Sequence, residues 1–532
     1  MAVTEIESAT TPAAAHRRPA SLRDWLAPPI PGSALWGWLG PLFVTLFAGF
    51  LRFDRLGVPK AVVFDETYYA KDAWALLKFG WEHKTVKDAD SLLIRDGSDA
   101  KIWEDGASFV AHPPGGKWMI AIGEAIFGAT PFGWRFTAAL AGTLSVLILC
   151  RVARRMTGST LLGCAAGLLL AVDGLAFVTS RTALLDVFVM FWVLAGFACL
   201  LIDRDRSRRA LAEKVEDGVG GSLGPFVMHW WRVAAGVCLG LACAVKWSGI
   251  FFIAAFGIMV VLWDAGARRA ARVRNPYAGA IGLDALPSFV SLVVVGLLTY
   301  LATWAGWIFK PGGWGRGEVA GNPLLRPLEA MPDLWRHHKD ILDFHNGLTT
   351  AHTYQSWPWD WPILRRPVAF FYTEPRDDCA AARCSREILG IGTPAFWWGA
   401  TIALIVLVGV WLVRRDWRAG AILLGFMAGW LPWFVPAFGD RTMFLFYATP
   451  MLPFMALAVA LALGLLIGPA RQATVHLARH APSANRRLLG SAVAGAYLLM
   501  VLVNFAYFYP VLAAKIIPYE DWDARIWFNS WI

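Results

Sequence analysis

Residues 442–467 read TMFLFYATPMLPFMALAVALALGLLI, a stretch of 26 residues without a single charged side chain. An α-helix rises 1.5 Å per residue, so about 20 apolar residues cross the roughly 30 Å of hydrocarbon in a bilayer. The stretch therefore predicts a membrane-spanning helix.

The composition of the whole chain agrees with this interpretation. Of its 532 residues, 57% are hydrophobic and 17% are charged, and the mean hydropathy is +0.49. Soluble domains hold about 25% charged residues, so these values exclude a soluble enzyme, a disordered chain and a coiled coil. We predict an all-α polytopic membrane protein with about eleven transmembrane helices, at residues 36–51, 133–150, 160–178, 183–202, 230–246, 248–264, 285–306, 395–413, 419–438, 442–467 and 489–509.

Basic side chains are distributed unevenly between the two sides that eleven spans define. The N-terminal side carries 22 Lys and Arg residues, mostly in short loops. The two long loops on the other side are balanced: residues 52–132 carry 10 basic and 12 acidic residues, and residues 307–394 carry 10 of each. An excess of Lys and Arg in short loops marks the cytoplasmic side. We therefore expect a plasma-membrane protein with a cytoplasmic N-terminus and two large exterior loops.

The net charge of +10 follows from this asymmetry, and we interpret it as a topology signal and not as a sign of a nucleic-acid partner. Residues 1–35 are polar and rich in Ala and Pro, without an apolar core followed by a cleavage site, and we expect a flexible cytoplasmic tail. Residues 36–510 are expected to form the catalytic transmembrane domain and residues 511–532 an exterior C-terminal tail.

Ionisable residues near the spans gather at the exterior ends. A channel or carrier usually places such groups near the midplane, so this distribution favours a site at the outer membrane face. The chain contains no GxxxxGK[ST], HExxH or GxSxG sequence, and ATP hydrolysis, zinc proteolysis and serine hydrolysis lack support. The residues concerned are Asp173, Arg181, Asp186, Lys246, Asp440 and Arg441.

Two adjacent carboxylates, Asp65 and Glu66, lie near the start of the first exterior loop. Neighbouring side chains point about 100° apart on a helix, so we expect separate roles, one as a base for an incoming hydroxyl and the other holding a cation or the loop. The structural alternative is a helix N-cap followed by a first-turn acid. His112 follows in the sequence AHPPGGKW, which also reads as a turn entering an interfacial helix.

Two basic residues lie at exterior breaks between spans, Arg181 in SRTALLD and Lys246 in AVKWSG. Either one can be a simple anchor of its span at the interface. Both lie on the same face as a carboxylate loop, which favours recognition of an anionic lipid headgroup, since a guanidinium binds phosphate through two hydrogen bonds.

The second exterior loop contains HNGLTTAHTYQSWPWDWP at residues 345–362. Its Trp and Pro residues favour interfacial seating and also suit a platform for a sugar or an extended peptide. The histidines of this loop fit no standard metal site, and we predict no metal ligands. Cys379 and Cys384 lie in the same loop on the oxidising side, where a local disulfide is expected.

Six motifs, in order along the chain, resemble one family. The chain resembles the protein O-mannosyltransferases, membrane glycosyltransferases of the GT-C fold, over roughly residues 36–510, and the span count agrees. The motifs are FDE at 64–66, HPP at 112–114, SR with LLD at 180–186, VKWSG at 245–249, HTYQSWPWDWP at 352–362 and RTMFLFYATP at 441–450.

The resemblance implies an inverting transfer of mannose from a polyprenyl-phosphate-mannose donor to Ser or Thr hydroxyls of a translocating protein. It implies Asp65 as the general base and Arg181 as a ligand of the lipid phosphate. The other residues that the matched motifs place at or near the site are Glu66, Arg52, Lys246, His112, His352, Tyr354 and Arg441.

The expected partners are the lipid-linked donor, a Ser/Thr-rich acceptor polypeptide, membrane lipid and the protein translocon. No cofactor is implied, and the need for a divalent metal is left open. Eukaryotic members carry a β-trefoil MIR domain in the second large loop, for which residues 307–394 are too few. This departure fits bacterial, actinobacterial-type members.

Two alternatives remain. A related GT-C transferase could glycosylate a lipid or a polysaccharide with the same donor chemistry. A lipid or solute transporter is the alternative of another class, and it predicts charged residues near the bilayer midplane.

Overall fold

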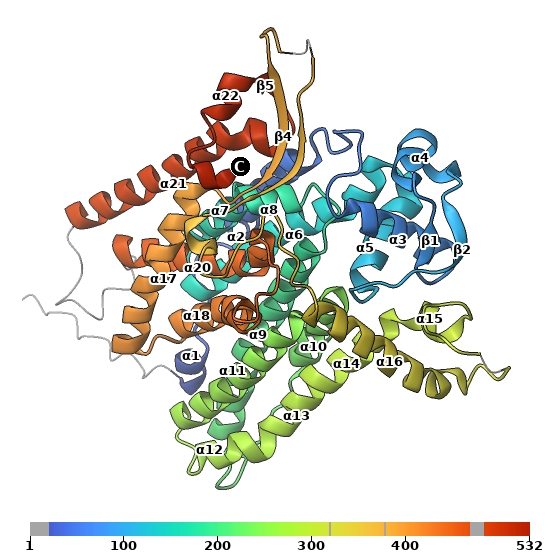
Figure 1. Cartoon of the computed structure of the whole chain (residues 1–532). Helices are drawn as coiled ribbons and strands as arrows, with labels where there is room; N and C mark the ends of the chain where they lie inside the picture. Colours follow the sequence, from blue (N-terminus) through green and yellow to red (C-terminus); the bar gives the residue numbers. More distant parts are fainter. Residues whose placement is uncertain (1–20, 319–320, 377–378, 469–483) are drawn as a thin grey trace, which may run out of the picture.

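The structure, a computed structural model, describes residues 21–318, 321–376, 379–468 and 484–532 (Figure 1). Within these residues nine helices are long and apolar enough to cross a membrane, and two shorter apolar helices are Thr160–Ala171 (α7) and Trp230–Val245 (α10). The nine are Trp36–Phe53 (α2), Pro131–Thr157 (α6), Asp186–Glu216 (α9), Gly249–Ala270 (α11), Pro276–Thr303 (α12 to α14), Pro394–Arg414 (α17), Trp417–Ala437 (α18 and α19), Leu445–Ile467 (ending in α20) and Asn485–Leu512 (in α21).

Each of the eleven predicted ranges therefore contains a helix, and the mainly helical membrane fold is confirmed. The count of eleven spans stays a prediction, because α7 and α10 are shorter than a bilayer-spanning helix requires. Both lie inside the bundle, where packing against longer neighbours compensates for their length.

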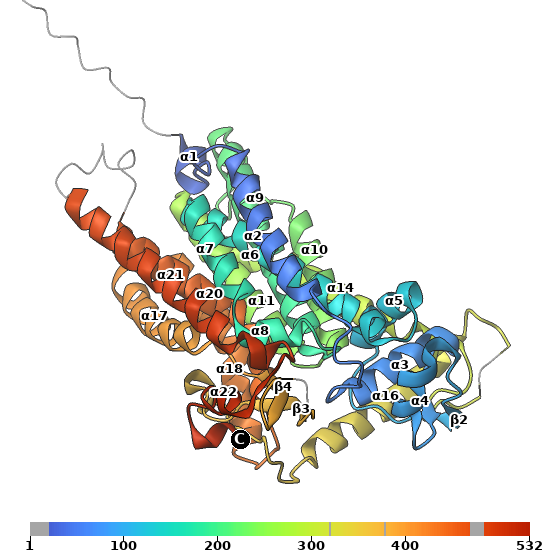
Figure 2. The same ribbon diagram turned by 90° about the horizontal axis from the view of Figure 1, so that it is seen from above.

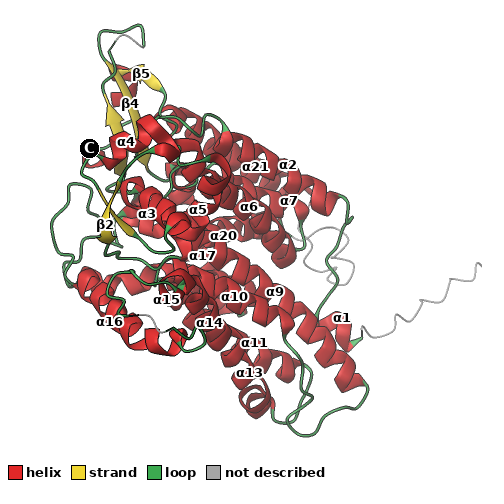
Figure 3. Ribbon diagram, turned by 90° about the vertical axis from the view of Figure 1, so that its right-hand side faces the viewer, coloured by secondary structure: helices red, strands yellow, loops and turns green. Residues whose placement is uncertain are grey.

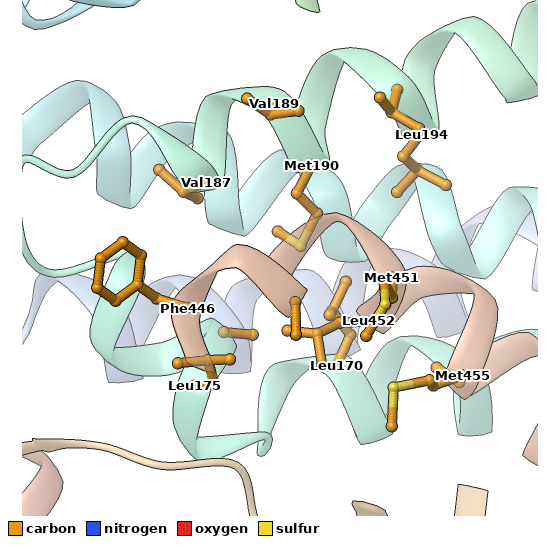
Figure 4. Close-up of a cluster of buried hydrophobic side chains, with 14 of the residues drawn as sticks. Leu170, Leu175, Val187, Val189, Met190, Leu194, Phe446, Met451, Leu452 and Met455 are labelled. Atoms are coloured by element: carbon orange, nitrogen blue, oxygen red, sulfur yellow. The ribbon is translucent and has the colours of Figure 1, made fainter. Parts of the chain in front are cut away.

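The core of the bundle is formed by α6, α9 and α20. Their most apolar windows are 61%, 67% and 72% buried, whereas those of α2 and α21 are only 28% and 22% buried. Figure 4 shows Leu170 on α7, Met190 on α9 and Leu452 on α20 gathered in one cluster. The outer helices expose leucine and phenylalanine side chains, as expected for surfaces that face lipid.

Small residues allow α10 (Trp230–Val245) to approach α14 (Val295–Thr303) closely. A Cβ atom on Gly236 would overlap the carbonyl oxygen of Ser291, and one on Gly240 would overlap that of Gly296. Helices in a membrane associate through such close backbone approach, because lipid tails offer no hydrophobic driving force between them.

The two long loops and the C-terminal segment fold into a layer at one end of the bundle. Figure 3 shows the strands at the end opposite to α1 (Leu22–Leu26), and Figure 2 shows the same separation from another side. The first loop holds α3 (Glu66–Lys78), β1 (His83–Thr85), α4 (Ala89–Asp96), β2 (Trp103–Ala107) and α5 (Gly115–Phe127). The second holds α15 (Ala305–Phe309), α16 (Arg326–Asn346), β3 (Val368–Thr373) and β4 (Cys384–Gly390).

Residues 511–532, expected as a tail, are part of this layer. Strand β5 (Ile516–Pro518) pairs antiparallel with β4, giving the order β3-β4-β5, and α22 (Tyr519–Asp523) follows. The indole of Trp531 is buried and donates a hydrogen bond of 2.8 Å to the carbonyl of Leu364. A disulfide joins Cys379 to Cys384, where β4 begins.

The opposite end of the bundle also buries charge, which the sequence interpretation did not anticipate. Arg232 on α10 is hydrogen-bonded to Asp203 on α9 at 2.8 Å and to Asp264 on α11 at 2.9 Å. Arg268 binds both oxygens of Asp284 at 2.7 and 2.8 Å. Buried ionisable residues therefore lie at both ends of the spans.

Candidate active site

Asp65 lies at the junction between the first apolar helix and the layer formed by the two long loops, immediately before α3. It occupies the N-cap position, as the structural alternative expects, but its carboxylate makes no capping hydrogen bond. The preceding residue, Phe64, has a φ of 50°, a conformation that costs a non-glycine residue free energy. Its ring stacks on Phe370 at 4.9 Å, which fixes the backbone at Asp65 against β3.

Glu66 points away from this position into a closed cage. Its carboxylate accepts hydrogen bonds from Arg135 at 2.7 and 2.8 Å and from the backbone amides of Val63 at 2.9 Å and Ala183 at 3.0 Å. Both ionic side chains are almost fully buried. The two adjacent carboxylates thus lie in different surroundings, and the carboxylate of Glu66 is fixed by four hydrogen bonds.

Arg135 was missed by the sequence analysis. It also donates to the carbonyl oxygens of Pro59 at 3.0 Å and Ala61 at 2.9 Å, so it holds the loop that leads to Asp65. The available signal was a lone arginine near the start of an apolar span, at 133–150. The resemblance had instead assigned the supporting role to Arg52, which donates to the carbonyls of Leu170 and Ala171 at 3.2 Å.

Lys246 and Asp186 form the charged partner of Asp65. The ammonium of Lys246 lies 2.8 Å from Asp186 Oδ2 and over the rings of Phe446 and Tyr447, at 5.7 and 5.2 Å. Burial raises the pKa of Asp65 to about 6, while Lys246 lowers it and Asp186 raises it. An acid with this pKa is ionised at neutral pH and still basic enough to accept a proton.

A pair of histidines and Arg441 form the neighbouring wall. The Nε2 of His345 contacts the carbonyl of Ala111 at 2.8 Å, and Arg441 Nη2 approaches its Nδ1 at 3.3 Å. Since a carbonyl only accepts and a guanidinium only donates, His345 is the neutral tautomer protonated on Nε2. Its ring lies 5.2 Å from that of His112.

The wall carries positive charge although its imidazoles are not protonated. Burial lowers the pKa of His345 to about 4 and lowers that of His112 well below its usual range, and Lys246 and Arg441 act in the same direction. Two permanent cations therefore accompany neutral histidines, an arrangement suited to an anionic group.

His352 and Tyr354 lie at the rim of the same region. The backbone amide of Tyr354 donates to His352 Nδ1 at 3.1 Å, and the ring of His352 packs on Phe444 at 5.1 Å. Phe444 in turn contacts Phe64, with ring centroids 6.4 Å apart. The structure therefore links these residues to the segment that carries Asp65.

Arg181 lies in the same turn as Ala183, before α9, but its guanidinium is directed at the backbone. Its Nη1 donates to the carbonyls of Leu51 at 3.0 Å and Arg52 at 2.8 Å, and the side chain is almost fully buried. This contact ties the end of α2 to the turn before α9. The phosphate-binding role that the resemblance implies for Arg181 stays a prediction.

Within the residues that the structure describes, no three His, Cys, Asp or Glu side chains are grouped so that they could hold a metal ion.

Two family descriptions match the chain. "Dolichyl-phosphate-mannose-protein mannosyltransferase" matches residues 42–303, and "C-terminal four TMM region of protein-O-mannosyltransferase" matches residues 330–531. The polyprenol-phosphate-mannose--protein mannosyltransferase of Mycobacterium tuberculosis is 40% identical, over 94% of this chain and 93% of that protein. The chain belongs to the protein O-mannosyltransferase family. The resemblance drawn from six short motifs is thereby confirmed.

Other members of the protein O-mannosyltransferase family support the same assignment. A protein of the same name in Corynebacterium glutamicum is 32% identical, over 92% of this chain and 91% of its own. The solved S. cerevisiae protein O-mannosyltransferase Pmt1-Pmt2 complex bound to the sugar donor covers 96% of this chain and 94% of that chain, with a TM-score of 0.69 at 15% identity. This likeness concerns the fold, and the predicted GT-C membrane fold is confirmed.

Proposed function

We propose that this chain transfers mannose from a polyprenyl-phosphate-mannose donor to Ser or Thr hydroxyls of proteins, at the exterior face of the membrane. The observation that carries the proposal is the position of Asp65, a carboxylate with a raised pKa beside Lys246 and next to a wall with a second cation, Arg441. The names of the relatives in M. tuberculosis and C. glutamicum support the same donor and acceptor.

Asp65 acts as the general base. Its carboxylate takes the proton of the acceptor hydroxyl while the hydroxyl oxygen forms a bond to the anomeric carbon of mannose. A correctly placed base contributes about 10²–10⁴-fold to the rate. Attack from the face opposite the phosphate converts the β-linked donor into an α-linked product, through an oxocarbenium-like transition state.

The leaving group is the polyprenyl phosphate, which takes the electron pair of the breaking bond between the anomeric carbon and oxygen. We place its growing charge against Lys246 and Arg441. A hydrogen bond from a charged group contributes about 1.5–3 kcal/mol, and here it acts on the charge that develops in the transition state. Phosphate leaves as a stable anion, so no general acid is required.

Four further assignments complete the proposal. Glu66 and Arg135 hold the loop that presents Asp65, and Asp186 orients the ammonium of Lys246. We assign His112, His352 and Tyr354 to contacts with the sugar or the acceptor, because they lie near Asp65 and Lys246. Arg181 stabilises the turn before α9, because four backbone carbonyls surround its guanidinium.

The topology belongs to the same proposal. We place the N-terminus in the cytoplasm, and the layer of α3, α5, α16 and the β3-β4-β5 sheet outside. An unfolded Ser/Thr-rich segment leaving the translocon would meet Asp65 at this surface. Labelling of single cysteines placed in residues 97–99 with a membrane-impermeant reagent tests the orientation, since reaction only after lysis would reverse it.

The deciding experiment uses the purified protein in proteoliposomes with polyprenyl-phosphate-mannose. A Ser/Thr/Pro-rich peptide is offered together with its Ser/Thr→Ala control, and mass spectrometry follows addition of one hexose. Transfer to the first peptide alone supports the proposal. Transfer to lipid or glycan acceptors in place of the peptide would support the related GT-C activity, and donor movement that survives Asp65→Asn would indicate a transporter.

A further inference from the structure

Helix α16 (Arg326–Asn346) lies outside the membrane-spanning bundle, and the proposed chemistry uses only its C-terminal end. Figure 2 shows that it runs across the direction of α21 and not along it, at the exterior end of the molecule. Its 21 residues divide into three faces of different character.

The first face packs on the ends of the spans. Ala330, Leu334 and Ile341 are buried, and they form one cluster with Tyr300 and Trp304 of the preceding span and with Trp307 and Ile308 of α15. His337 is buried on the same face, against Trp304 at 5.4 Å. This face fixes the helix directly above the exterior end of α14.

The second face is apolar and exposed. Leu328, Trp335 and Leu342 follow each other at intervals of seven residues, so they lie along one line of the helix, and their exposed fractions are 72%, 70% and 48%. Large apolar side chains in a continuous line are rarely left in water by a soluble surface. Such a line marks contact with another apolar phase or molecule.

The third face is charged and exposed. It carries Arg336, Asp340 and Asp343. Successive residues of a helix are rotated by about 100° about its axis. Around this axis, the apolar line lies about 130° from the packed face in one direction. The charged residues lie about 120° from the packed face in the opposite direction. The two exposed flanks therefore lie on either side of the packed face.

The neighbours of each flank show which side is the membrane side. Between the packed face and the apolar line, His338 Nε2 lies 2.6 Å from the hydroxyl of Tyr300, a residue of a spanning helix, and its ring stacks on Trp247 at 5.6 Å. On the charged side, Asp333 accepts hydrogen bonds from Arg316 at 3.1 Å and from the amide of Gly317 at 2.9 Å, both in the exterior loop.

We propose that α16 is an interfacial helix that lies in the outer leaflet, with the line of Leu328, Trp335 and Leu342 in the acyl-chain boundary and the charged flank in water. Leu297 and Leu298 on α14, the span on which α16 packs, are also exposed apolar side chains. Amphipathic helices bind the boundary of a bilayer in this way, with the apolar side buried to a depth of about 5–10 Å.

The position of α16 in the outer leaflet has a consequence for the candidate active site. This consequence rests on the proposed function. His345, in the last turn of α16, contacts both Ala111 and Arg441. A helix fixed at the leaflet boundary therefore holds the cationic wall at a constant height above the lipid headgroups. A phosphate attached to a membrane-embedded polyprenol arrives at that height.

The position of α16 in the leaflet is tested with spin labels in proteoliposomes, independently of activity. Single cysteines replace Leu328, Trp335 and Leu342 on the apolar flank, and Arg336, Asp340 and Asp343 on the charged flank as matched controls. These substitutions are made in a variant that lacks the five free cysteines and that must first be shown to transfer mannose. The five are Cys150, Cys164, Cys199, Cys238 and Cys243. We expect labels on the apolar flank to collide with oxygen and not with a water-soluble nickel complex, and labels on the charged flank to show the reverse.

Equal nickel accessibility on both flanks would overturn the proposal and make the apolar line a surface for a soluble partner or the acceptor. Spin–spin broadening confined to the apolar line would also overturn it, in favour of a second copy of this chain. Leu328 and Leu342 suffice if the Trp335 variant does not fold, because both side chains are exposed.

A kinetic measurement examines the consequence for the site. Leu328→Glu combined with Trp335→Glu should raise the KM for the lipid donor about tenfold with little change in kcat, because the helix leaves the boundary. The control Asp340→Asn with Asp343→Asn, on the charged flank, should leave both unchanged. If the spin labels give the expected pattern but the KM of the first variant is unchanged, α16 lies in the leaflet boundary but its position there does not affect donor binding.

Discussion

The two ends of the bundle bury charged side chains in contrasting ways. At the end near α1, Arg232 lies between Asp203 and Asp264, and Arg268 binds both oxygens of Asp284. At the other end, Asp65 has no capping hydrogen bond, and its pKa is raised to about 6. The paired charges near α1 are buried and hold helices together, whereas Asp65 is only partly buried, so its carboxylate is accessible to a substrate.

The same contrast separates two neighbours in the chain. Glu66 accepts four hydrogen bonds and is completely buried, which assigns it to the paired class although it follows Asp65 directly. Position beside a catalytic residue therefore does not make a residue catalytic. The completeness of its hydrogen bonding is the better criterion, since an unsatisfied buried charge costs free energy that only a function can justify.

The contrast between the two ends of the bundle is tested most directly by a substitution of Asp65. Asp65→Asn keeps the shape of the side chain and removes the base, so we expect initial rates of peptide mannosylation to fall by about 10²–10⁴-fold. Donor binding and the thermal midpoint should be unchanged, because the carboxylate caps no helix. Wild-type rates in this variant would contradict the base assignment.

Removal of one arginine from an ion pair at each end of the bundle tests the same contrast further. Arg135→Met and Arg232→Met each leave a buried carboxylate without its cation, and each should destabilise the protein by about 3–5 kcal/mol. Thermal unfolding in detergent and the yield of folded protein measure this loss. Only Arg135→Met should also lower the rate per folded molecule, because Arg135 holds the loop before Asp65.

The controls for these variants neutralise the second partner. Glu66→Gln added to Arg135→Met should recover part of the stability but not the activity. A normal rate per folded molecule in Arg135→Met would separate the loop from catalysis.

Removal of Lys246 is expected to have a smaller effect. A hydrogen bond to a charged group contributes about 1.5–3 kcal/mol, so Lys246→Met should lower kcat/KM for the donor about 10- to 150-fold. Arg181→Met is the matched comparison, and it should reduce folded yield more than donor use. The opposite pattern would restore Arg181 as the phosphate ligand.

The smallest effect is the dependence on pH. Asp65 must be ionised to accept a proton, and its pKa is about 6, so activity should be full above this value and fall about tenfold per pH unit below it. Because Lys246 lowers the pKa of Asp65, this acidic limb should move to higher pH in Lys246→Met. A limb that stays in place would show that Lys246 does not act on Asp65.

Several features of the site could be predicted from the sequence because they depend on local patterns. Asp65, Lys246 and Arg441 were identified from short motifs at the exterior ends of spans, and the structure places all three in one region. Arg135 could not be selected, since one arginine near the start of an apolar span looks the same whether it anchors the span or pairs with an acid. The folded C-terminal strand β5 was missed because three residues give too short a pattern.

The sequence by itself determined the place of the apolar segments, the charge asymmetry and the family. These depend on runs of neighbouring residues, which hydrocarbon selects over about 20 positions. Only the tertiary structure decided which charges meet: Glu66 lies 69 residues from Arg135, and Asp186 lies 60 residues from Lys246. Electrostatic pairing acts over a few ångströms of space and is indifferent to distance along the chain, so it was decided when the helices packed.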